Sequence, residues 1–216
     1  MADFRLRIGY AKQGSALWLS HLEVLRAMER MLRRSRLPYA ISQGFSPHIK
    51  HTNSAALPVG TASTGEYMDV ELMSLVNPDQ ALKSLQAAQL KDMPILSAVY
   101  VAKDAPSLQL YFNRATYLIE IEDPQGTLVS ELVGRLQEKG KIEVLKKKKF
   151  KVYDLSRYVA EAKIASSNNN ILSLSLLSRP EGSLRPEVIV NALSEPDEPP
   201  RIIALTRTNL EHEELK

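Results

Sequence analysis

The chain has 216 residues, of which 44% are hydrophobic and 25% are charged, so it is globular and forms one domain or two small ones. It contains no cysteine, which excludes disulfides, thiolate zinc sites, iron–sulfur clusters and cysteine nucleophiles. The sequence starts without a signal peptide, and no apolar run approaches the ~20 residues that span a bilayer, so we expect a soluble cytoplasmic protein.

The net charge is only +3, but it is unevenly distributed. Residues 1–60 hold nine basic residues against three acidic ones, and residues 139–151 hold seven lysines against Glu143. Residues 181–216 are acidic, with eight Asp or Glu against four Lys or Arg. Such asymmetry steers anionic partners toward the basic parts, and nucleic acid is the usual one.

Hydrophobic periodicity, caps and turn residues predict the elements of the first half. Ser20 and Glu23 form a capping box at the start of a helix that we expect to bury Leu22, Leu25, Met28 and Leu32. The elements in order are a strand at Phe4–Tyr10, a helix at Ser20–Ser35, extended segments at Tyr39–Ile41 and Thr52–Leu57, a strand at Glu66–Met73 after turns at Gly60 and Gly65, a helix from Pro78 to about Gln89, and a strand at Pro94–Ala102.

The second half repeats this order of elements, although not the residues themselves. The predicted elements are a strand at Tyr117–Glu122, a helix at Gln125–Lys139, a strand at Ile142–Val152 that continues through Tyr153–Val159, a strand at Ile171–Leu177, a helix at Arg185–Leu193, and a strand at Arg201–Arg207. Two βαββαβ units predict an α+β protein with two tandem ferredoxin-like modules, each an antiparallel sheet backed by two helices. We place the N-terminal module at 1–105 and the C-terminal module at 114–216.

Three arginines of the first helix, Arg26, Arg30 and Arg33, are four and three residues apart and share one face. The fork geometry of arginine matches phosphate, so this stripe is a candidate phosphate-binding surface. A solvated basic face without a ligand is the alternative.

The segment after the helix is a candidate binding loop. Gly44 permits backbone conformations that other residues avoid, Phe45 could stack on a base, and Ser46, His48 and Lys50 could contact phosphate, with Tyr39 close by in sequence. The alternative is a structural turn with Phe45 in the core. The loop lacks the spacing of a Walker motif.

The histidines suggest two further kinds of site. His21 or His48 could transfer protons on RNA, and His48 and His51 could bind a metal together with His21 or Glu66. Neither set is complete, so we predict no metal and no cofactor, and His21 and His48 remain weak catalytic candidates.

Two charged features fit both a structural and a functional interpretation. Asp69 falls on the apolar side of an alternating strand and could pair with an arginine of the basic helix. The run Lys146–Lys149 could protect an edge strand or bind phosphate.

Several segments together resemble a bacterial radical-SAM-linked family of unknown function, whose members stand alone or are fused behind a cobalamin-binding-type radical-SAM enzyme. The family patterns are S-H-L-D, R-R-x-x-L-P, S-x-G-F-N-P-H-P-K and L-P-L-G-x-x-S-x-x-E. This chain departs from them at Glu23, Ser46 and Ile49. The matching segments are Leu19–Glu23, Arg33–Tyr39, Ser42–His48, Leu57–Gly60 and Gly65–Asp69.

The resemblance implies a partner radical-SAM enzyme and a link to RNA, while the missing cysteines mean that this chain is not the radical generator. We therefore predict a non-catalytic binding module that presents RNA or another phosphate-rich substrate to that enzyme. The alternatives are a metal-independent RNA-processing or RNA-modifying enzyme that uses a histidine, and a scaffold that docks the partner enzyme.

Overall fold

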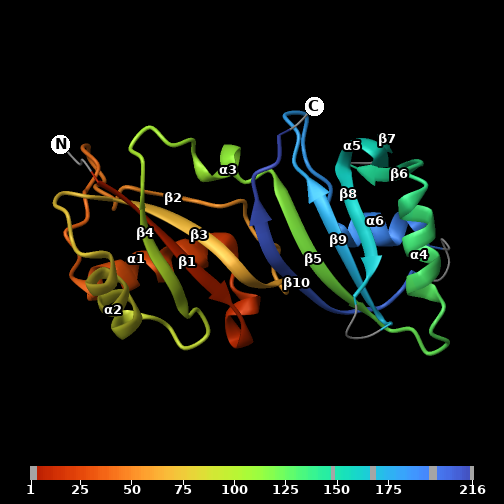
Figure 1. The fold of residues 1–216 in the computed structure, drawn as a ribbon, viewed down its shortest axis with the longest axis horizontal. Helices are drawn as coiled ribbons and strands as arrows, with labels where there is room; N and C mark the ends of the chain where they lie inside the picture. The colour runs from red at the N-terminus through yellow and green to blue at the C-terminus, as the bar shows by residue number, and fades with distance from the viewer. Residues whose placement is uncertain (1–3, 147–148, 166–168, 195–198, 215–216) are drawn as a thin grey trace. The chain divides into compact units, whose positions relative to one another are not determined.

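The computed structural model describes residues 4–146, 149–165, 169–194 and 199–214. The chain forms two compact units, Met1–Phe112 and Asn113–Lys216, each with a hydrophobic core (Figure 1). Both units are α+β with antiparallel strand pairing, which confirms the predicted class. Within the described ranges, no helix combines the length and the apolar character needed to span a membrane.

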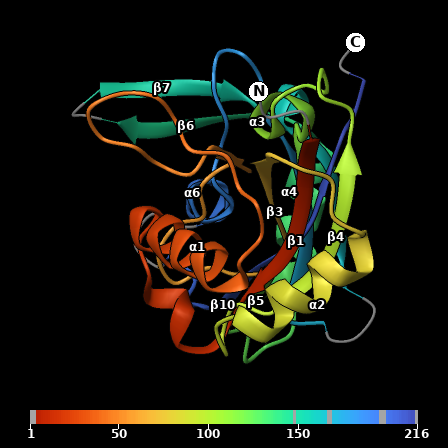
Figure 2. The ribbon, with the colours of Figure 1, turned by 90° about the vertical axis from the view of Figure 1, so that its left-hand side faces the viewer.

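The first unit is an antiparallel sheet with two long helices on one face. Its elements are β1 (Phe4–Lys12), η1 (Gly14–Trp18), α1 (His21–Ser35), β2 (His51–Asn53), β3 (Ala62–Leu72), α2 (Pro78–Ala88), β4 (Ile95–Val101) and α3 (Leu108–Tyr111). β1 pairs with β3 and β4, and β2 pairs with β3, so the order is β4-β1-β3-β2. Figure 2 shows α1 and α2 on the same side of these strands.

α1 begins and ends where the sequence predicts. The backbone N–H of Glu23 donates to Ser20 Oγ over 3.4 Å, and the backbone N–H of Ser20 donates to Glu23 Oε2 over 2.8 Å, so the capping box is formed. At the other end, Arg34 Nη2 donates to the carbonyl of Ala88 over 2.8 Å and links α1 to the end of α2. The local sequence therefore fixes the start of this helix, and a contact with α2 holds its other end.

The buried face of α1 differs from the predicted one at Leu22, and at Leu25, which is only partly buried. Met28 and Leu32 are buried as expected, and Val24 and Met31 join them, but Leu22 is 63% exposed. The core-facing stripe follows Val24, Met28 and Met31 at spacings of four and three, and Leu22 falls on the far side of that stripe. Leu22 was predicted to be buried because it lies three residues before Leu25. In the structure α1 is rotated so that Val24 and Met28 face the core, which leaves Leu22 on the solvent side.

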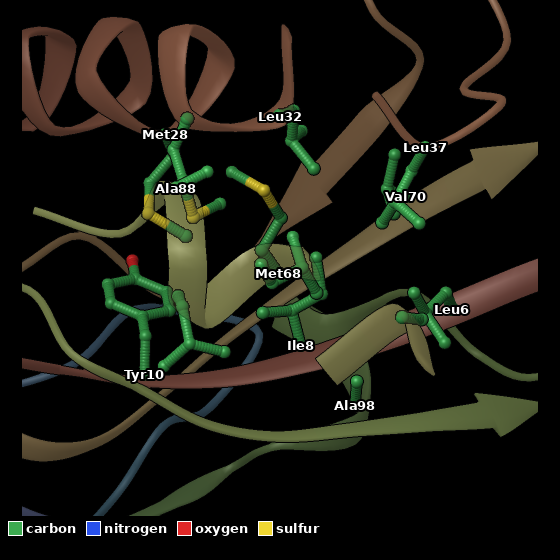
Figure 3. Packing of buried hydrophobic residues seen from close by; sticks show 14 of the residues in the cluster. Leu6, Ile8, Tyr10, Met28, Leu32, Leu37, Met68, Val70, Ala88 and Ala98 are labelled. Atoms are coloured by element: carbon green, nitrogen blue, oxygen red, sulfur yellow. The ribbon is translucent and has the colours of Figure 1, made fainter. Parts of the chain in front are cut away.

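The core of this unit lies between α1, α2 and the sheet (Figure 3). Alternate residues of β1 and β3 point into it, as the pleat requires, whereas the register shift of β4 opposite Gly9 and Tyr10 puts Ile95 and Ala98 there. Residues labelled in the figure are Leu6, Ile8, Tyr10, Met28, Leu32, Leu37, Met68, Val70, Ala88 and Ala98.

Several boundaries between α1 and α2 differ from prediction. β3 begins at Ala62 instead of Glu66, because Ser63 continues the pairing with Lys12 of β1, and Gly65 lies inside the strand rather than in a turn. The segment Tyr39–Ile41 forms only isolated bridges rather than a strand. The short helices η1 and α3 were not predicted.

The second unit has the same order of pairing. Its elements are β5 (Arg114–Ile121), α4 (Leu128–Gln137), β6 (Lys141–Lys146), β7 (Lys149–Asp154), α5 (Leu155–Tyr158), β8 (Val159–Ile164), β9 (Ile171–Leu177), α6 (Pro186–Leu193) and β10 (Ile202–Glu211). The sheet order is β10-β5-β9-β8, again last strand, first, third and second once the β6–β7 pair is set aside.

The lysine-rich segment is a hairpin and not the single strand that we predicted at Ile142–Val152. β6 and β7 pair antiparallel, with Lys146 opposite Lys149, and form a separate two-stranded sheet. The predicted strand crossed the lysine run because alternation alone does not mark a reversal of the chain. Lys147 and Lys148 lie outside the described residues, as does most of the predicted loop at residues 195–200.

Candidate nucleic-acid interface

The arginine stripe lies on the outer face of α1. Arg26, Arg30 and Arg33 are all exposed, and they lie on the opposite side of the helix from Val24 and Met28. Among the described residues, neither Arg30 nor Arg33 has a carboxylate within 4.0 Å. Two guanidinium groups are therefore open to an external anion.

Arg26 differs from its two neighbours because it lies one turn after Glu23. The pKa of Glu23 is lowered, mainly by the hydrogen bond from the Ser20 hydroxyl and to a smaller extent by the charge of Arg26. The Glu23 carboxylate thus offsets part of the positive charge at the start of the stripe. The strongest uncompensated charge lies at Arg30 and Arg33.

The loop after α1 is closed at its base and exposed at its tip. The backbone N–H of Ser42 donates to the carbonyl of His48 over 2.8 Å, and the backbone N–H of His48 donates to Ser42 Oγ over 3.0 Å. Gly44 has a φ of 134°, in the region that favours glycine. Ser46 is exposed and Phe45 is completely exposed, so the alternative that placed Phe45 in the core is wrong.

Tyr39 and Lys50 connect this loop to the sheet. The N–H of Ala40 donates to the carbonyl of Glu71 over 2.8 Å, the N–H of Lys50 donates to the carbonyl of Ala40 over 2.9 Å, and Tyr39 is half-buried against the core. Lys50 Nζ lies 3.3 Å from Glu71 Oε2. A phosphate at Lys50 would therefore compete with a carboxylate, unlike a phosphate at Arg30 or Arg33.

The structure thus assembles the predicted site residues into two groups. Tyr39, Gly44, Phe45, Ser46, His48 and Lys50 share one hydrogen-bonded loop, and the three arginines share one helix face. In the described part of the chain, no hydrogen bond or ion pair joins an arginine of the stripe to the loop.

The three histidines of the motif region lie in three different environments. His48 is exposed on the loop, while His51 Nε2 lies 3.3 Å from Glu29 Oε1 and its Nδ1 lies 2.9 Å from Asn53 Nδ2. His21 lines a small pocket elsewhere. Within the described residues, no three His, Asp or Glu side chains gather in a way that could hold a metal ion.

The pocket at His21 contains two buried charges that sequence reasoning did not connect. Lys12 is 1% exposed and Glu66 is 3% exposed, and Lys12 Nζ donates to two backbone carbonyls over 3.2 and 3.3 Å. Glu66 accepts hydrogen bonds from the hydroxyls of Ser54 and Ser63. The cavity is about 20 Å³, which is room for about one water. This arrangement satisfies buried charge and does not leave space for a substrate.

Asp69 pairs with Arg7 of β1, and not with an arginine of α1 as we expected. The two residues face each other in the β1–β3 register, with Nε to Oδ1 at 2.8 Å and Nη2 to Oδ2 at 3.0 Å. The hydrogen bond to Asp69 is the main reason that the pKa of Arg7 is raised. The prediction that Asp69 falls on the apolar side of the strand was wrong, because Met68 and Val70 point into the core and Asp69 points to the opposite face. That face is not covered by α1, so the helix arginines cannot reach Asp69.

Exposed apolar side chains near α1 were also missed. Trp18, the single tryptophan, is 71% exposed, and Val59 is exposed as well, next to the N–H of Gly60, which donates to the carbonyl of Leu17. Together with Leu22 they add an apolar surface at the start of the arginine helix. The position of Trp18 two residues before Ser20 of the capping box was the available signal.

The β6–β7 hairpin carries the second basic cluster. Lys149 and Lys151 are exposed, and Lys151 Nζ lies 4.9 Å from the centre of the Tyr153 ring. Leu145 and Phe150 face each other across the hairpin and are 63% and 73% exposed. Exposed apolar and basic side chains therefore alternate on these two short strands.

Comparison with solved structures found chains from a complex of Cbf5, Nop10 and Gar1 (TM-score 0.49), from an archaeal box H/ACA Nop10–Cbf5 complex (TM-score 0.48), and from an H/ACA ribonucleoprotein bound to a substrate RNA that contains 2′-deoxyuridine (TM-score 0.49). Each is 10% identical to this chain and aligns with 97–99% of it. The chain spans about half the length of these solved chains, with 48–51% covered. A likeness at this level assigns no function.

A search of curated proteins found no match. A family model, described as an uncharacterized protein conserved in bacteria (DUF2344), matches residues 5–186, which include the arginine stripe, the loop, the first core and most of the second. The chain therefore belongs to this uncharacterized bacterial family.

Proposed function

We propose that this protein is a non-catalytic module that binds RNA, or another phosphate-rich substrate, and presents it to a partner radical-SAM enzyme. The observation that carries the proposal is the outward-facing stripe on α1, in which Arg30 and Arg33 have no carboxylate within 4.0 Å among the described residues. Arginine binds phosphate oxygens through two parallel N–H donors, so such a stripe favours a polyanion.

Exposed aromatic rings support single-stranded RNA as the polyanion. Phe45 extends from the closed loop and Trp18 lies at the start of α1, and both expose most of their rings. Base–ring stacking contributes about 1–3 kcal/mol per base and tolerates any sequence. Phosphate contacts at the arginines and stacking at the rings would together bind a strand without sequence preference.

The two units support the modular part of the proposal. In each unit the strands pair antiparallel in the order last, first, third and second, as tandem ferredoxin-like modules would. We propose modules that correspond to these units, with the arginine stripe and loop in the first. The chain has no cysteine to ligate an iron–sulfur cluster, so any radical chemistry on the bound substrate would come from the partner enzyme.

The proposal is tested by fluorescence anisotropy with a mixed pool of single-stranded RNA at several salt concentrations. We compare the wild type with Arg30→Gln/Arg33→Gln, which removes two charges but keeps good helix formers. Each lost phosphate contact lowers the slope of log K against log salt by about 0.7, so the double variant should lose about 1.4 from the slope.

The matched control is Lys83→Gln/Lys91→Gln, which removes the same charge from exposed positions outside the stripe. It should leave the slope nearly unchanged. If the wild type does not bind RNA, or if both double variants bind equally well, the stripe is not a phosphate site. The exposed Trp18, Leu22 and Val59 would then favour the scaffold that docks the partner enzyme.

A further inference from the structure

The face of the first sheet opposite α1 and α2 carries a row of charges in register. Arg5 and Arg7 are two residues apart on β1, so both point to this face, directly opposite Glu71 and Asp69 of β3. The end of the first unit covers one part of the row, because the rings of Tyr111 and Phe112 lie 5.4 and 5.5 Å from the Arg7 guanidinium. The other part of the row remains open.

The open part is a pocket of about 330 Å³. This volume falls within the range of small-molecule sites in proteins. Thr52 of β2 and Ser107, just before α3, add hydroxyl groups to its wall. The charged and hydroxyl-bearing side chains that line it are Arg5, Lys50, Thr52, Asp69, Glu71 and Ser107.

Three cations, Arg5, Arg7 and Lys50, lie in or beside the pocket against two carboxylates, Asp69 and Glu71. Asp69 is paired with Arg7, and Glu71 with Lys50, whose Nζ lies 3.3 Å away. Arg5 uses one N–H to donate to the carbonyl of Ala105 over 2.6 Å, and in the described ranges it has no carboxylate within 4.0 Å. The pocket therefore contains a guanidinium group that still lacks an anion.

We propose that this pocket binds one nucleotide monophosphate unit, with its phosphate on Arg5. The hydroxyls of Thr52 and Ser107 can donate to the phosphate oxygens, and Glu71 can accept from the ribose, because carboxylates are common partners of ribose hydroxyls. The anion and the diol of a nucleotide match these two sets of groups. The inference deepens the proposed function, on which it rests, by naming the unit of the substrate that is held.

The binding test uses isothermal titration calorimetry of the full chain with AMP, GMP, CMP and UMP, and with adenosine and inorganic phosphate as partial ligands. Nucleotides should bind at least 10-fold more tightly than either partial ligand. Binding of inorganic phosphate as tight as that of AMP would overturn the nucleotide assignment, and so would the absence of nucleotide binding.

Arg5→Gln should weaken nucleotide binding at least 10-fold, while Lys83→Gln, with the same loss of charge on α2, should leave it unchanged. Thr52→Val removes one hydroxyl and keeps a side chain suited to a strand, and we expect it to weaken binding 3- to 10-fold. Circular dichroism shows whether each variant is folded. If Arg5→Gln is unfolded, the affinity of Thr52→Val still tests the pocket. Wild-type affinity in both folded variants would contradict the assignment.

The nucleotide unit could be a free nucleotide or the 5′ end of an RNA. Affinities for a 5′-phosphorylated and a 5′-hydroxyl RNA tetramer distinguish these two ligands. Preference for the phosphorylated tetramer over free nucleotides identifies an RNA end, and the reverse identifies a free nucleotide. If Arg30→Gln/Arg33→Gln loses RNA binding and keeps mononucleotide binding, the result supports the stripe as the RNA site and the pocket as a distinct nucleotide site. If RNA binds and mononucleotides do not, the pocket assignment fails and the proposed function stands.

Discussion

Breaking the Arg7–Asp69 pair by Asp69→Asn should destabilise the first unit. The side chains of Arg7 and Asp69 are 11% and 3% exposed, and the two hydrogen bonds between them are 2.8 and 3.0 Å long. An asparagine offers one oxygen to the two N–H donors and turns an NH₂ toward the other, so a nearly buried guanidinium loses its counter-charge. Removing one partner of such a pair costs about 3–5 kcal/mol.

The magnitude is measured by urea unfolding, together with hydrogen exchange of the β1 and β3 amides, which reports on the first unit alone. Arg7→Met should cost a similar amount, because it leaves Asp69 unpaired. The double variant Arg7→Met/Asp69→Leu should cost less than either single change, since no charge is left behind. Additive effects, or single effects below about 1 kcal/mol, would refute the view that the pair is an energetically coupled buried unit.

The pH dependence of the pair follows from the raised pKa of Arg7. A group whose folded pKa is raised contributes stability that is fully present below its unfolded pKa and is lost as pH rises through the folded value. The hydrogen bond to Asp69 is the main cause of the raised pKa, and an unfolded arginine already titrates far above neutral pH. The Arg7 contribution should therefore stay constant between pH 5 and pH 9.

Other substitutions test the helix cap, the second core and the loop. Ser20→Ala should cost about 1 kcal/mol and increase exchange in the first turn of α1. In the same variant, an NMR titration should show the pKa of Glu23 rising toward its usual value; in the wild type the stability from that lowered pKa is present above pH ~4.3 and is lost as pH falls through the folded value. Leu132→Ala should cost about 2–5 kcal/mol, because Leu132 is 1% exposed, and should accelerate exchange in β5 and β9. Phe45→Ala should change stability by less than about 0.5 kcal/mol.

The fold class and most long elements were predictable because their signals are local. The capping box fixed the start of α1, and Ile171–Leu177, which alternates strictly, is β9 with the same bounds. Local signals failed at the lysine run, where alternation continues across a chain reversal and hides the hairpin. They also failed at Gly65, which continues β3 at the point where its register with β1 shifts between Tyr10 and Lys12, an irregularity at which a strand accommodates glycine.

The candidate site was predictable only in part, because local sequence signals do not show which distant residues face each other. The arginine stripe depends on helix periodicity, which the sequence shows directly. The partner of Asp69 and the pocket at Arg5 depend on strand register, which brings residues more than 60 positions apart face to face. The sequence places Arg5 and Arg7 on one face of a strand, but it does not identify the strand that faces them.

The hydrogen bonds between Ser42 and His48 hold the base of the loop without using any side chain of its tip. They hold the base of the loop through one side chain and the backbone, so the chemistry of residues 45–47 is independent of the fold beneath them. Phe45 at the tip is fully exposed, so a substitution there changes the chemistry of the surface and removes no contact of the core. The base of the loop and the tip therefore tolerate change to different degrees.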